Sequence, residues 1–425
     1  KAFKYRIYPT PTQREFIEKH FGCCRLLYNL ALEVKVSAWK SVAQKNVSIY
    51  EIKKEIKLLR KEFDWMKEIN CDSQHLTLLN LDKAYNNFFK SHKGFPKYKS
   101  KRGSQSFQLS QSEVNLNKGK VFISKLESGI KTVFHRKFKG IIKTTTISRT
   151  PAGKYFVSIL VDNGLALPEN KPIIKESSVG IDLGLNHFAI LSDGNKIDSP
   201  KFLRKSQSKL KWMGKKLSRK QKGSNRFRRC VNRLAKQHAK IANQRSNFTH
   251  NLSAKITDKY DTICMEKLNV KGMSAKCKPK QDEKSKYLPN RQSQKRGLNK
   301  SIADAGWGMF VNQNEYKAKW RGKNFVQIGT FERSSKECSV CGTINNLLAL
   351  KDREWICTGC GTWHDRDENA AKVIENKGIS KLTGQVYRPS GRGDGSQLQS
   401  SKGVVQSINE ASKNENLLYQ ICDTS

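Results

Sequence analysis

The sequence predicts a chain that combines all-α, all-β and α/β parts. Apolar residues at helical spacing dominate residues 11–93, and short apolar runs separated by Gly, Pro and Lys dominate residues 94–162. Beyond residue 171, apolar strands that carry carboxylates alternate with basic helical segments, and two pairs of cysteines follow. We therefore expect a helical unit, a small β-barrel and an α/β domain with an inserted zinc ribbon.

Net charge limits the possible functions most strongly. The 425 residues suffice for two or three domains, and 81 Lys and Arg against 37 Asp and Glu give a formal charge of +44. Such a charge excludes an ordinary enzyme of small molecules and calls for a polyanionic partner, nucleic acid first and an anionic membrane second. No apolar run approaches ~20 residues, so no membrane span is expected. Eleven cysteines without a regular framework indicate a reducing, cytoplasmic location.

The first ten residues predict one strand of the barrel. Phe3, Tyr5 and Ile7 alternate with residues of the other face, as in a half-buried strand. A lone strand needs a sheet elsewhere in the chain to complete it. The rest of the barrel is expected over residues 94–170, where the segments VFIS, IKTVFH, GIIKTTTIS and KYFVSILVD are strand-like.

A helical insertion is expected between these two parts, over residues 11–93. Thr10 and Gln13 have the pattern of a capping box for a helix that runs to about Trp39. Further helices are expected at residues 49–63 and from residue 72. The core side chains of the last helix are expected to be Leu76, Leu79, Ala84, Tyr85, Phe88 and Phe89.

Three carboxylates mark the expected α/β domain at residues 171–332 and the helix after it. Asp182 lies inside the apolar run SVGIDLGLNHFAIL, and Glu266 lies near the end of the strand-like YDTICMEKLNV. Asp367 lies where a helix begins, and the helix dipole favours an anion there. A carboxylate in an apolar run is costly unless a cation compensates it. Carboxylates from two strands and a helix start commonly build a two-metal phosphodiester site, so we predict two Mg²⁺ ions at these residues.

Four cysteines predict a structural zinc site in a ribbon over residues 333–364. Cys338 and Cys341 form one C-x2-C pair, Cys357 and Cys360 form the second, and fifteen residues separate the pairs. This spacing is typical of tetrahedral Zn²⁺, whereas redox chemistry would need only one pair. Because four thiolates close the coordination sphere, the nearby His364 is expected on the surface or beside the ligands. A final helix is expected at residues 365–378.

A basic region predicts a nucleic-acid surface. Residues 201–255 are expected to form a hairpin of two helices broken at Gly223-Ser224-Asn225. A solvated helix face ordinarily mixes charges of both signs, whereas this region has almost no acids. The side chains expected to contact phosphates are Lys215, Lys216, Arg219, Lys220, Arg226, Arg228, Arg229 and Arg233.

The remaining segments are less informative. Residues 272–300 are polar and basic and are expected to form a mobile loop, and residues 301–321 predict one amphipathic helix. A further strand is expected at residues 325–328. Residues 379–425, rich in Ser, Gly and Asn, are expected to form a disordered tail to which the sequence assigns no function.

The motifs G-I-D-L-G-L, M-E-K-L-N-V, the two cysteine pairs and D-R-D-E-N-A-A follow one another in this order. As an ordered set they resemble the RuvC-like nuclease half of TnpB, a family of transposon-encoded relatives of type V CRISPR effectors. The resemblance implies an RNase H-like fold with catalytic residues Asp182, Glu266 and Asp367. It selects Asp367 over Asp365, because in the family the third acid precedes x-N-A-A.

The same resemblance implies the organisation and the activity of the whole chain. The barrel would be a wedge domain interrupted by a helical recognition lobe, in which Gln74 and His75 lie in the segment that touches a short target-adjacent motif. The implied activity is that of an RNA-guided DNA endonuclease. A guide RNA from the flanking locus would bind the basic hairpin and the barrel and pair with double-stranded target DNA.

Other classes of protein stay open as alternatives. A nucleic-acid-binding regulator or transposition accessory protein could use this scaffold without cleavage, although all three acids are present. Sugar-kinase and actin-like ATPases also contain G-I-D-L-G, but Thr residues usually follow there, whereas Leu185-Asn186-His187 follows here. A protein-only transposase is a third option, which the motifs do not resemble. Taken singly, Asp182 could be a turn residue, Glu266 a solvent-facing strand end and Asp367 a helix N-cap.

Overall fold

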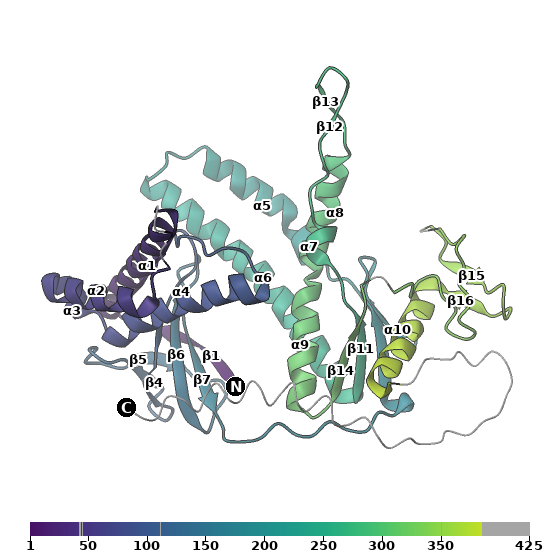
Figure 1. Ribbon diagram of the computed structural model, residues 1–425, viewed down its shortest axis with the longest axis horizontal. Helices are drawn as coiled ribbons and strands as arrows, with labels where there is room; N and C mark the ends of the chain where they lie inside the picture. Colours follow the sequence, from purple (N-terminus) through teal and green to yellow (C-terminus); the bar gives the residue numbers. More distant parts are fainter. Residues whose placement is uncertain (42–43, 45, 111, 331, 350, 385–425) are drawn as a thin grey trace.

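Two lobes make up the computed structural model (Figure 1), which describes residues 1–41, 44, 46–110, 112–330, 332–349 and 351–384. The N-terminal lobe combines helices with a large antiparallel sheet, and the C-terminal lobe is built on a five-stranded sheet. A helical hairpin crosses between the lobes at the top of Figure 1, and an extended segment after residue 162 joins them below. Within the described residues, no helix has both the length and the apolar character needed to cross a membrane.

The helical insertion contains α1 Pro11–Lys40, α2 Ile49–Glu62, α3 Asp64–Glu68 and α4 Cys71–Ser91. The predicted capping box is confirmed, since Thr10 Oγ1 accepts from the Gln13 N–H and Gln13 Oε1 accepts from the Thr10 N–H. Apolar residues of α1, α2 and α4 meet in one core. The helices therefore pack as a small bundle beside the sheet, as the apolar spacing predicts.

The inward face of α4 was predicted wrongly. Leu78 and Leu81 are buried, whereas Phe89 is 67% exposed. Apolar residues lie on more than one side of this helix, so spacing alone does not select a face. The aromatic residues near its C-terminal end pack instead against Phe95, whose ring centroid lies 5.3 Å from that of Phe88 and 5.6 Å from that of Tyr85.

A buried histidine joins α1 to the start of α4. His20 is fully buried, its Nδ1 lies 2.9 Å from the carbonyl oxygen of Phe16, and its Nε2 accepts from the N–H of Asn70 at 3.1 Å. These partners require a neutral ring with the proton on Nδ1. Burial lowers the pKa of His20 to about 4.

We expect stability to fall as the pH falls from 6.5 toward 4, because in this window the unfolded chain binds a proton at this position and the folded chain does not. Between pH 7 and pH 5 the loss from His20 is about 2 kcal/mol. Urea unfolding of the wild type and of His20→Gln at both pH values checks this. Because His20→Gln has no titrating group at this position, its free energy of unfolding should fall by about 2 kcal/mol less than that of the wild type between pH 7 and pH 5. Equal losses in the two proteins would contradict a neutral, buried His20.

Seven antiparallel strands form the sheet of the N-terminal lobe. They are β1 Ala2–Tyr8, β2 Gln105–Leu109, β3 Glu113–Asn115, β4 Lys120–Phe122, β5 Ile130–Val133, β6 Ile141–Arg149 and β7 Tyr155–Asp162. Their order is β2-β6-β7-β1-β5-β4-β3. The N-terminal strand thus lies between β7 and β5, as the sequence predicts, and its buried Tyr5 and Ile7 join the core on one side of this half-barrel.

The sheet of the C-terminal lobe has the order β10-β9-β8-β11-β14. Its strands are β8 Ser178–Asp182, β9 His187–Leu191, β10 Lys196–Asp198, β11 Thr262–Glu266 and β14 Asn324–Ile328, and a short 3-10 turn, Lys175–Ser177, precedes β8. β8, β9 and β10 form an antiparallel meander, whereas β11 and β14 run parallel to β8.

Helices cover both faces of this sheet. On one face lie α6 Asn225–Lys259 and α9 Trp307–Trp320, whose Phe248 and Phe310 pack edge-on against Phe188 of β9. On the other face lies α10 Arg366–Thr383. A Cβ at Gly180 would lie 1.9 Å from the carbonyl oxygen of Ala371, so the glycine lets α10 approach β8 closely.

Two predictions about the segments between β11 and β14 were wrong. Residues 272–300 contain a β-hairpin, β12 Lys280–Gln281 with β13 Tyr287–Leu288, and most of α8 Gln292–Ala305, which together project upward in Figure 1. Backbone pairing in the hairpin organises this segment without an apolar core. The single helix expected at 301–321 is instead α8 and α9, which meet at Gly306 with a left-handed φ of 71°. A short helix, α7 Val270–Met273, follows β11.

The cysteine-containing insertion carries β15 Glu354–Ile356 and β16 Trp363–Asp365, and α10 follows directly. The predicted end of this helix at residue 378 was wrong, because α10 continues to Thr383. Gly378 resembles a helix stop in the sequence but lies inside α10, where a Cβ would meet Cys264 Sγ at 2.3 Å. The glycine is therefore a packing position against β11. The expected tail beyond residue 384 lies outside the described residues.

Candidate functional site

The strand register brings two of the predicted carboxylates together. In the parallel pair of β8 and β11, Met265 is opposite Ile181, so Glu266 and Asp182 end neighbouring strands at the same edge of the sheet. Successive side chains of a strand point to opposite faces. Val179, Ile181, Ile263 and Met265 belong to the core under α6 and α9. Asp182 and Glu266 therefore point to the α10 face.

The third carboxylate comes from α10. Asp367 lies in the first turn of this helix, which packs along β8 and β11 and begins near their carboxyl ends. Asp365, the other candidate acid, is the helix N-cap, because its Oδ1 accepts from the N–H groups of Asp367 and Glu368. Its second oxygen pairs with Lys196 at 2.6 Å. Asp365 is thus held by the cap and the ion pair.

The electrostatics show that the three acids share one environment. Burial and the charge of Asp367 raise the pKa of Asp182 to about 6. Burial and the charges of Asp182 and Glu332 raise the pKa of Glu266 to about 7. Asp367 thus opposes the ionisation of Asp182, and Asp182 opposes that of Glu266, and a divalent cation would offset this repulsion. This donor set suits Mg²⁺, which prefers carboxylate oxygens.

The acids do not converge on a single point. In the part of the chain that the structure describes, only the four cysteines place three or more possible ligand atoms within 4.8 Å of one another. Among the described residues, the three acids therefore do not form a preformed ligand cluster for a single ion.

Arg353 is a site residue that the sequence patterns did not reveal. It precedes β15 in the cysteine-containing insertion, and its Nη1 lies 3.4 Å from both carboxylate oxygens of Asp367. A guanidinium at this place can bind a phosphate oxygen as well as a carboxylate. An isolated Arg in a basic sequence carries no signal of such a role.

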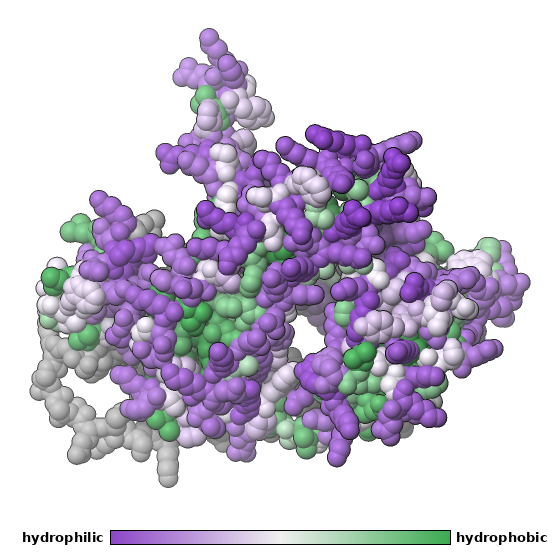
Figure 2. All heavy atoms as spheres, turned by 180° about the vertical axis from the view of Figure 1, so that it is seen from behind, coloured by the Kyte–Doolittle hydropathy of each residue, from purple (hydrophilic) through white to green (hydrophobic). Residues whose placement is uncertain are grey.

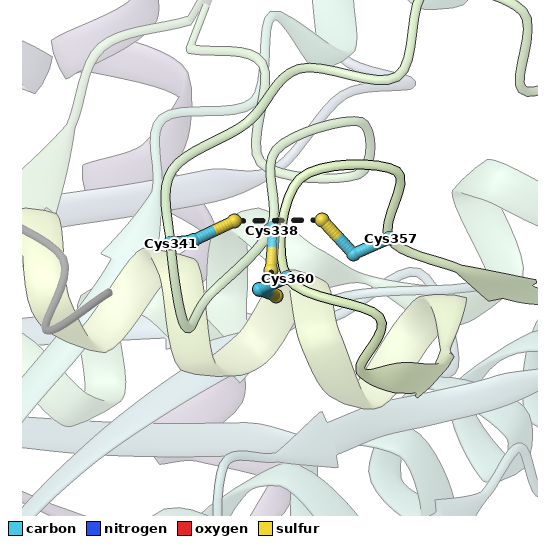
Figure 3. A group of neighbouring side chains, drawn as sticks. All are labelled: Cys338, Cys341, Cys357 and Cys360. Carbon is cyan, nitrogen blue, oxygen red and sulfur yellow. Dashed lines mark hydrogen bonds between the residues drawn. The ribbon is translucent and has the colours of Figure 1, made fainter. Parts of the chain in front are cut away.

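The four predicted zinc ligands converge (Figure 3). The sulfur atoms of Cys338 and Cys360 lie 3.7 Å apart, and those of Cys341 and Cys357 lie 3.4 Å apart. Two sulfurs bound to one tetrahedral zinc at ~2.3 Å would be separated by about 3.8 Å. The N–H groups of Val340 and Gly359 point at Cys338 Sγ and Cys357 Sγ, respectively, at 3.4 Å. The residues present therefore fit Zn²⁺.

His364 is not a surface residue. It is 6% exposed, its Nε2 lies 3.1 Å from Cys338 Sγ, and its ring packs against that of Trp355. Of the two places allowed by the sequence, the structure thus selects the one beside the ligands. An N–H donated to a thiolate would stabilise its negative charge.

The predicted helical hairpin is present as α5 Phe202–Ser218 and α6. The predicted phosphate contacts on α5, on α6 and in the turn between them are solvent-accessible, and none of these side chains pairs with an acid among the described residues. Figure 2, which shows the molecule from behind relative to Figure 1, shows a mostly hydrophilic surface with several apolar areas, including one at centre left. These contacts stay a prediction.

The two residues expected near the target-adjacent motif differ in their accessibility. Gln74 is 3% exposed, and its Nε2 donates to the carbonyl oxygen of Met66. His75 lines a pocket between α2 and α4 together with Lys53, Lys57 and Arg60. Both assignments stay predictions, and His75 is the more accessible of the two.

Comparisons with known proteins place the chain in a family. Residues 158–276 match a family model described as "Probable transposase", residues 307–374 match the Cas12f1-like TNB domain, and residues 1–44 match a helix-turn-helix domain. A protein from Streptomyces pristinaespiralis named "Putative RNA-guided DNA endonuclease" is 33% identical, with 92% of each chain covered. InsQ of Escherichia coli K12, which carries the same description, is 27% identical, with 92% of this chain and 96% of InsQ covered.

The chain therefore belongs to the TnpB family, the family that its ordered motifs resemble. Among solved structures, a Cas12f1–sgRNA–target DNA complex matches with a TM-score of 0.33 and 14% identity, covering 88% of this chain and 98% of that one. A score this low does not align individual residues.

Proposed function

We propose that this protein is an RNA-guided DNA endonuclease that hydrolyses DNA phosphodiesters at Asp182, Glu266 and Asp367. The observation that carries the proposal is that Asp182 and Glu266 end neighbouring parallel strands, and that the charge of Asp367, in the first turn of α10, acts on Asp182. The names of the relatives support a guide RNA and a DNA target as partners, and we propose that the DNA is double-stranded. The accessible basic hairpin α5–α6 offers a surface for their phosphates.

The nuclease domain is proposed to be RuvC-like. Its meander β8–β9–β10, followed by the parallel strands β11 and β14, supports an RNase H-like arrangement. The half-barrel would be the wedge domain and the helical insertion the recognition lobe. The proposed domain limits keep the sequence boundaries at residues 10, 93, 170, 332 and 364, with the final helix extended to residue 383.

The acids, Arg353 and the cysteines would have different roles in the proposed hydrolysis. Two bound Mg²⁺ ions would supply an activated water and stabilise the leaving oxygen. Asp182 and Glu266 would hold them from the rigid strand ends, and Asp367 would complete the set from α10. Arg353 would favour the approach of the scissile phosphate to Asp367. The zinc held by Cys338, Cys341, Cys357 and Cys360 would be structural.

Neutralising three arginines of α6 tests the proposed RNA surface. We expect Arg226→Gln, Arg228→Gln and Arg229→Gln together to weaken RNA binding and to reduce the slope of log K against log [salt] by about one unit or less per lost phosphate contact. Fluorescence titrations over a range of salt concentrations measure both quantities.

A matched control removes the same charge elsewhere. Lys19, Lys67 and Lys372 are each paired with an acid on the surface. Their triple Gln variant should keep a slope closer to that of the wild type. Equal slopes in the two triple variants would show that only total charge matters and that α6 is no specific surface.

The proposed activity is tested by co-expressing the chain with its native flanking DNA and sequencing the RNA that copurifies in high salt. We expect one discrete RNA with a constant body and a flank-derived end. A plasmid that carries the complement of that end beside a randomised adjacent motif should then be cut in Mg²⁺. If no specific RNA copurifies and no plasmid is cut, the proposal is wrong.

A further inference from the structure

The side chain of Asn369 connects α10 to the first cysteine pair. It is 1% exposed, its Nδ2 donates to the carbonyl oxygen of Glu337 at 2.6 Å, and its Oδ1 accepts from the N–H of Ser339 at 2.9 Å. Glu337 and Ser339 flank Cys338, so one side-chain amide forms hydrogen bonds with the backbone on both sides of a predicted zinc ligand. Replacing this amide would leave two buried peptide groups without these partners.

Two further residues of α10 extend the same contact. Asn376 lies seven residues after Asn369, about two helical turns along the same side. Its Nδ2 lies 3.4 Å from the carbonyl oxygen of Ser339. The ammonium group of Lys377 pairs with Glu337 at 2.7 Å and with Glu332 at 2.9 Å. The first cysteine pair is thus docked along one side of the helix.

The second half of the ribbon forms hydrogen bonds with the start of α10. The backbone N–H of Arg366 donates to the carbonyl oxygen of Arg353, and Arg366 Nη1 donates to that of Ala349, both at 2.8 Å. Arg353 in turn reaches Asp367. The helix turn that carries Asp367 is therefore held by the ribbon on both sides.

From these contacts we infer that Asn369 is a positioning residue that couples the zinc-bound ribbon to the placement of Asp367. The inference deepens the proposed function and rests on it where cleavage is concerned. Zinc bound to Cys338 would fix the peptide groups of Glu337 and Ser339. Because Asn369 is hydrogen-bonded to these groups, they in turn fix the position of α10 two residues after Asp367. Without Asn369, the ribbon can still bind zinc, but it no longer holds the catalytic turn at the edge of the sheet.

The variant Asn369→Leu tests the inference, because it keeps the branched side-chain shape and removes both hydrogen bonds. The first readout is the rate at which a chromophoric chelator withdraws zinc from the full-length protein. The second is the affinity for Mn²⁺ at the acids, measured by electron paramagnetic resonance without nucleic acid. We expect at least tenfold faster zinc release and at least tenfold weaker Mn²⁺ binding.

Single-turnover cleavage by the guide-loaded protein is the third readout. Asn369→Leu should slow it at least tenfold in the zinc-loaded protein. In a Cys360→Ser background that has lost its zinc, it should cause no further loss of Mn²⁺ affinity or cleavage. Asn369→Asp keeps the acceptor for Ser339 and loses the donor to Glu337, so it should give an intermediate effect if the leucine variant does not fold.

Asn345→Ala is the control within the ribbon, since this residue accepts the local N–H of Leu347 at 3.1 Å. With zinc bound, it should cleave at the wild-type rate. Wild-type Mn²⁺ affinity in Asn369→Leu, or equal losses with and without zinc, would overturn the inference. If the wild type itself does not cleave DNA, the proposed function fails, while zinc release and Mn²⁺ affinity still decide the coupling.

Discussion

Replacing Asp182 with asparagine is expected to reduce DNA cleavage by at least about 10³-fold while leaving nucleic-acid binding within about twofold of the wild type. The change removes the charge from the strand end that interacts electrostatically with both Glu266 and Asp367, so the proposed Mg²⁺ ions would lose a ligand. Single-turnover cleavage of a matched target and mobility-shift assays with guide RNA measure the two effects. Glu266→Gln should behave in the same way.

Asp198→Asn is the matched control. This carboxylate ends β10 in the same sheet, its side chain is 90% exposed, and it pairs with His187. It should leave cleavage unchanged. Full activity in Asp182→Asn would show that Asp182 is not a catalytic residue. The raised pKa of Glu266 would then reflect only its burial and the charges beside it, and no role in catalysis.

The same variant should stabilise the protein when magnesium is absent. The pKa of Asp182 is raised from 3.8 to about 6 in the fold, so the carboxylate contributes stability below pH 3.8 that is lost as the pH rises through 6. Asp182→Asn removes the free-energy cost of keeping this buried carboxylate ionised, which is about 3 kcal/mol at pH 8. Thermal unfolding in zinc-containing, magnesium-free buffer should show a higher midpoint for the variant at pH 8 than for the wild type, and little difference at pH 4.

Positions set by local rules are predictable from this sequence. The common placement of Asp182 and Glu266 is predictable because a strand alternates its side chains and parallel strands end at the same edge. Asp367 lies on a helix, and the motif resemblance proposes it. The cysteines can be assigned because zinc imposes its own spacing. The cap at Thr10 and the break at Gly223 follow from turn and cap chemistry, and the structure contains both.

Tertiary contacts decided the features that the sequence did not reveal. Gly378 resembles a helix stop but is the place where α10 touches Cys264. Arg353 contacts Asp367, 14 residues away, and no local pattern marks it. Asn369 belongs to the motif D-R-D-E-N-A-A, but only the fold brings its side chain to Glu337 and Ser339. His364 lies on a β-strand of the ribbon, and only the fold of the ribbon brings its ring to Cys338.

Replacing Cys357 with serine is expected to remove zinc from the protein and to unfold the ribbon. The ribbon has a very small core, in which Cys338, Leu348, Trp355 and Cys357 are the buried members. So few apolar side chains cannot offset the entropy of ordering the segment, and metal binding contributes ~10–16 kcal/mol in isolated zinc-binding peptides. Native mass spectrometry should find zinc in the wild type and none in the variant. Cys71→Ser, which changes an exposed thiol of α4, should keep its zinc.

The cleavage rate of the zinc-free variant then shows whether Asp367 is positioned by the ribbon or by the packing of α10 on the sheet. If the ribbon positions α10, cleavage should fall at least ~10²-fold, the size of effect expected from misplacing a group by about 1 Å. Unfolding of the helical lobe should be unchanged, because its core is separate from that of the ribbon. Unchanged cleavage with zinc absent would mean that packing of α10 on Gly180 and Cys264 alone fixes Asp367, and unchanged zinc content would contradict the ligand set.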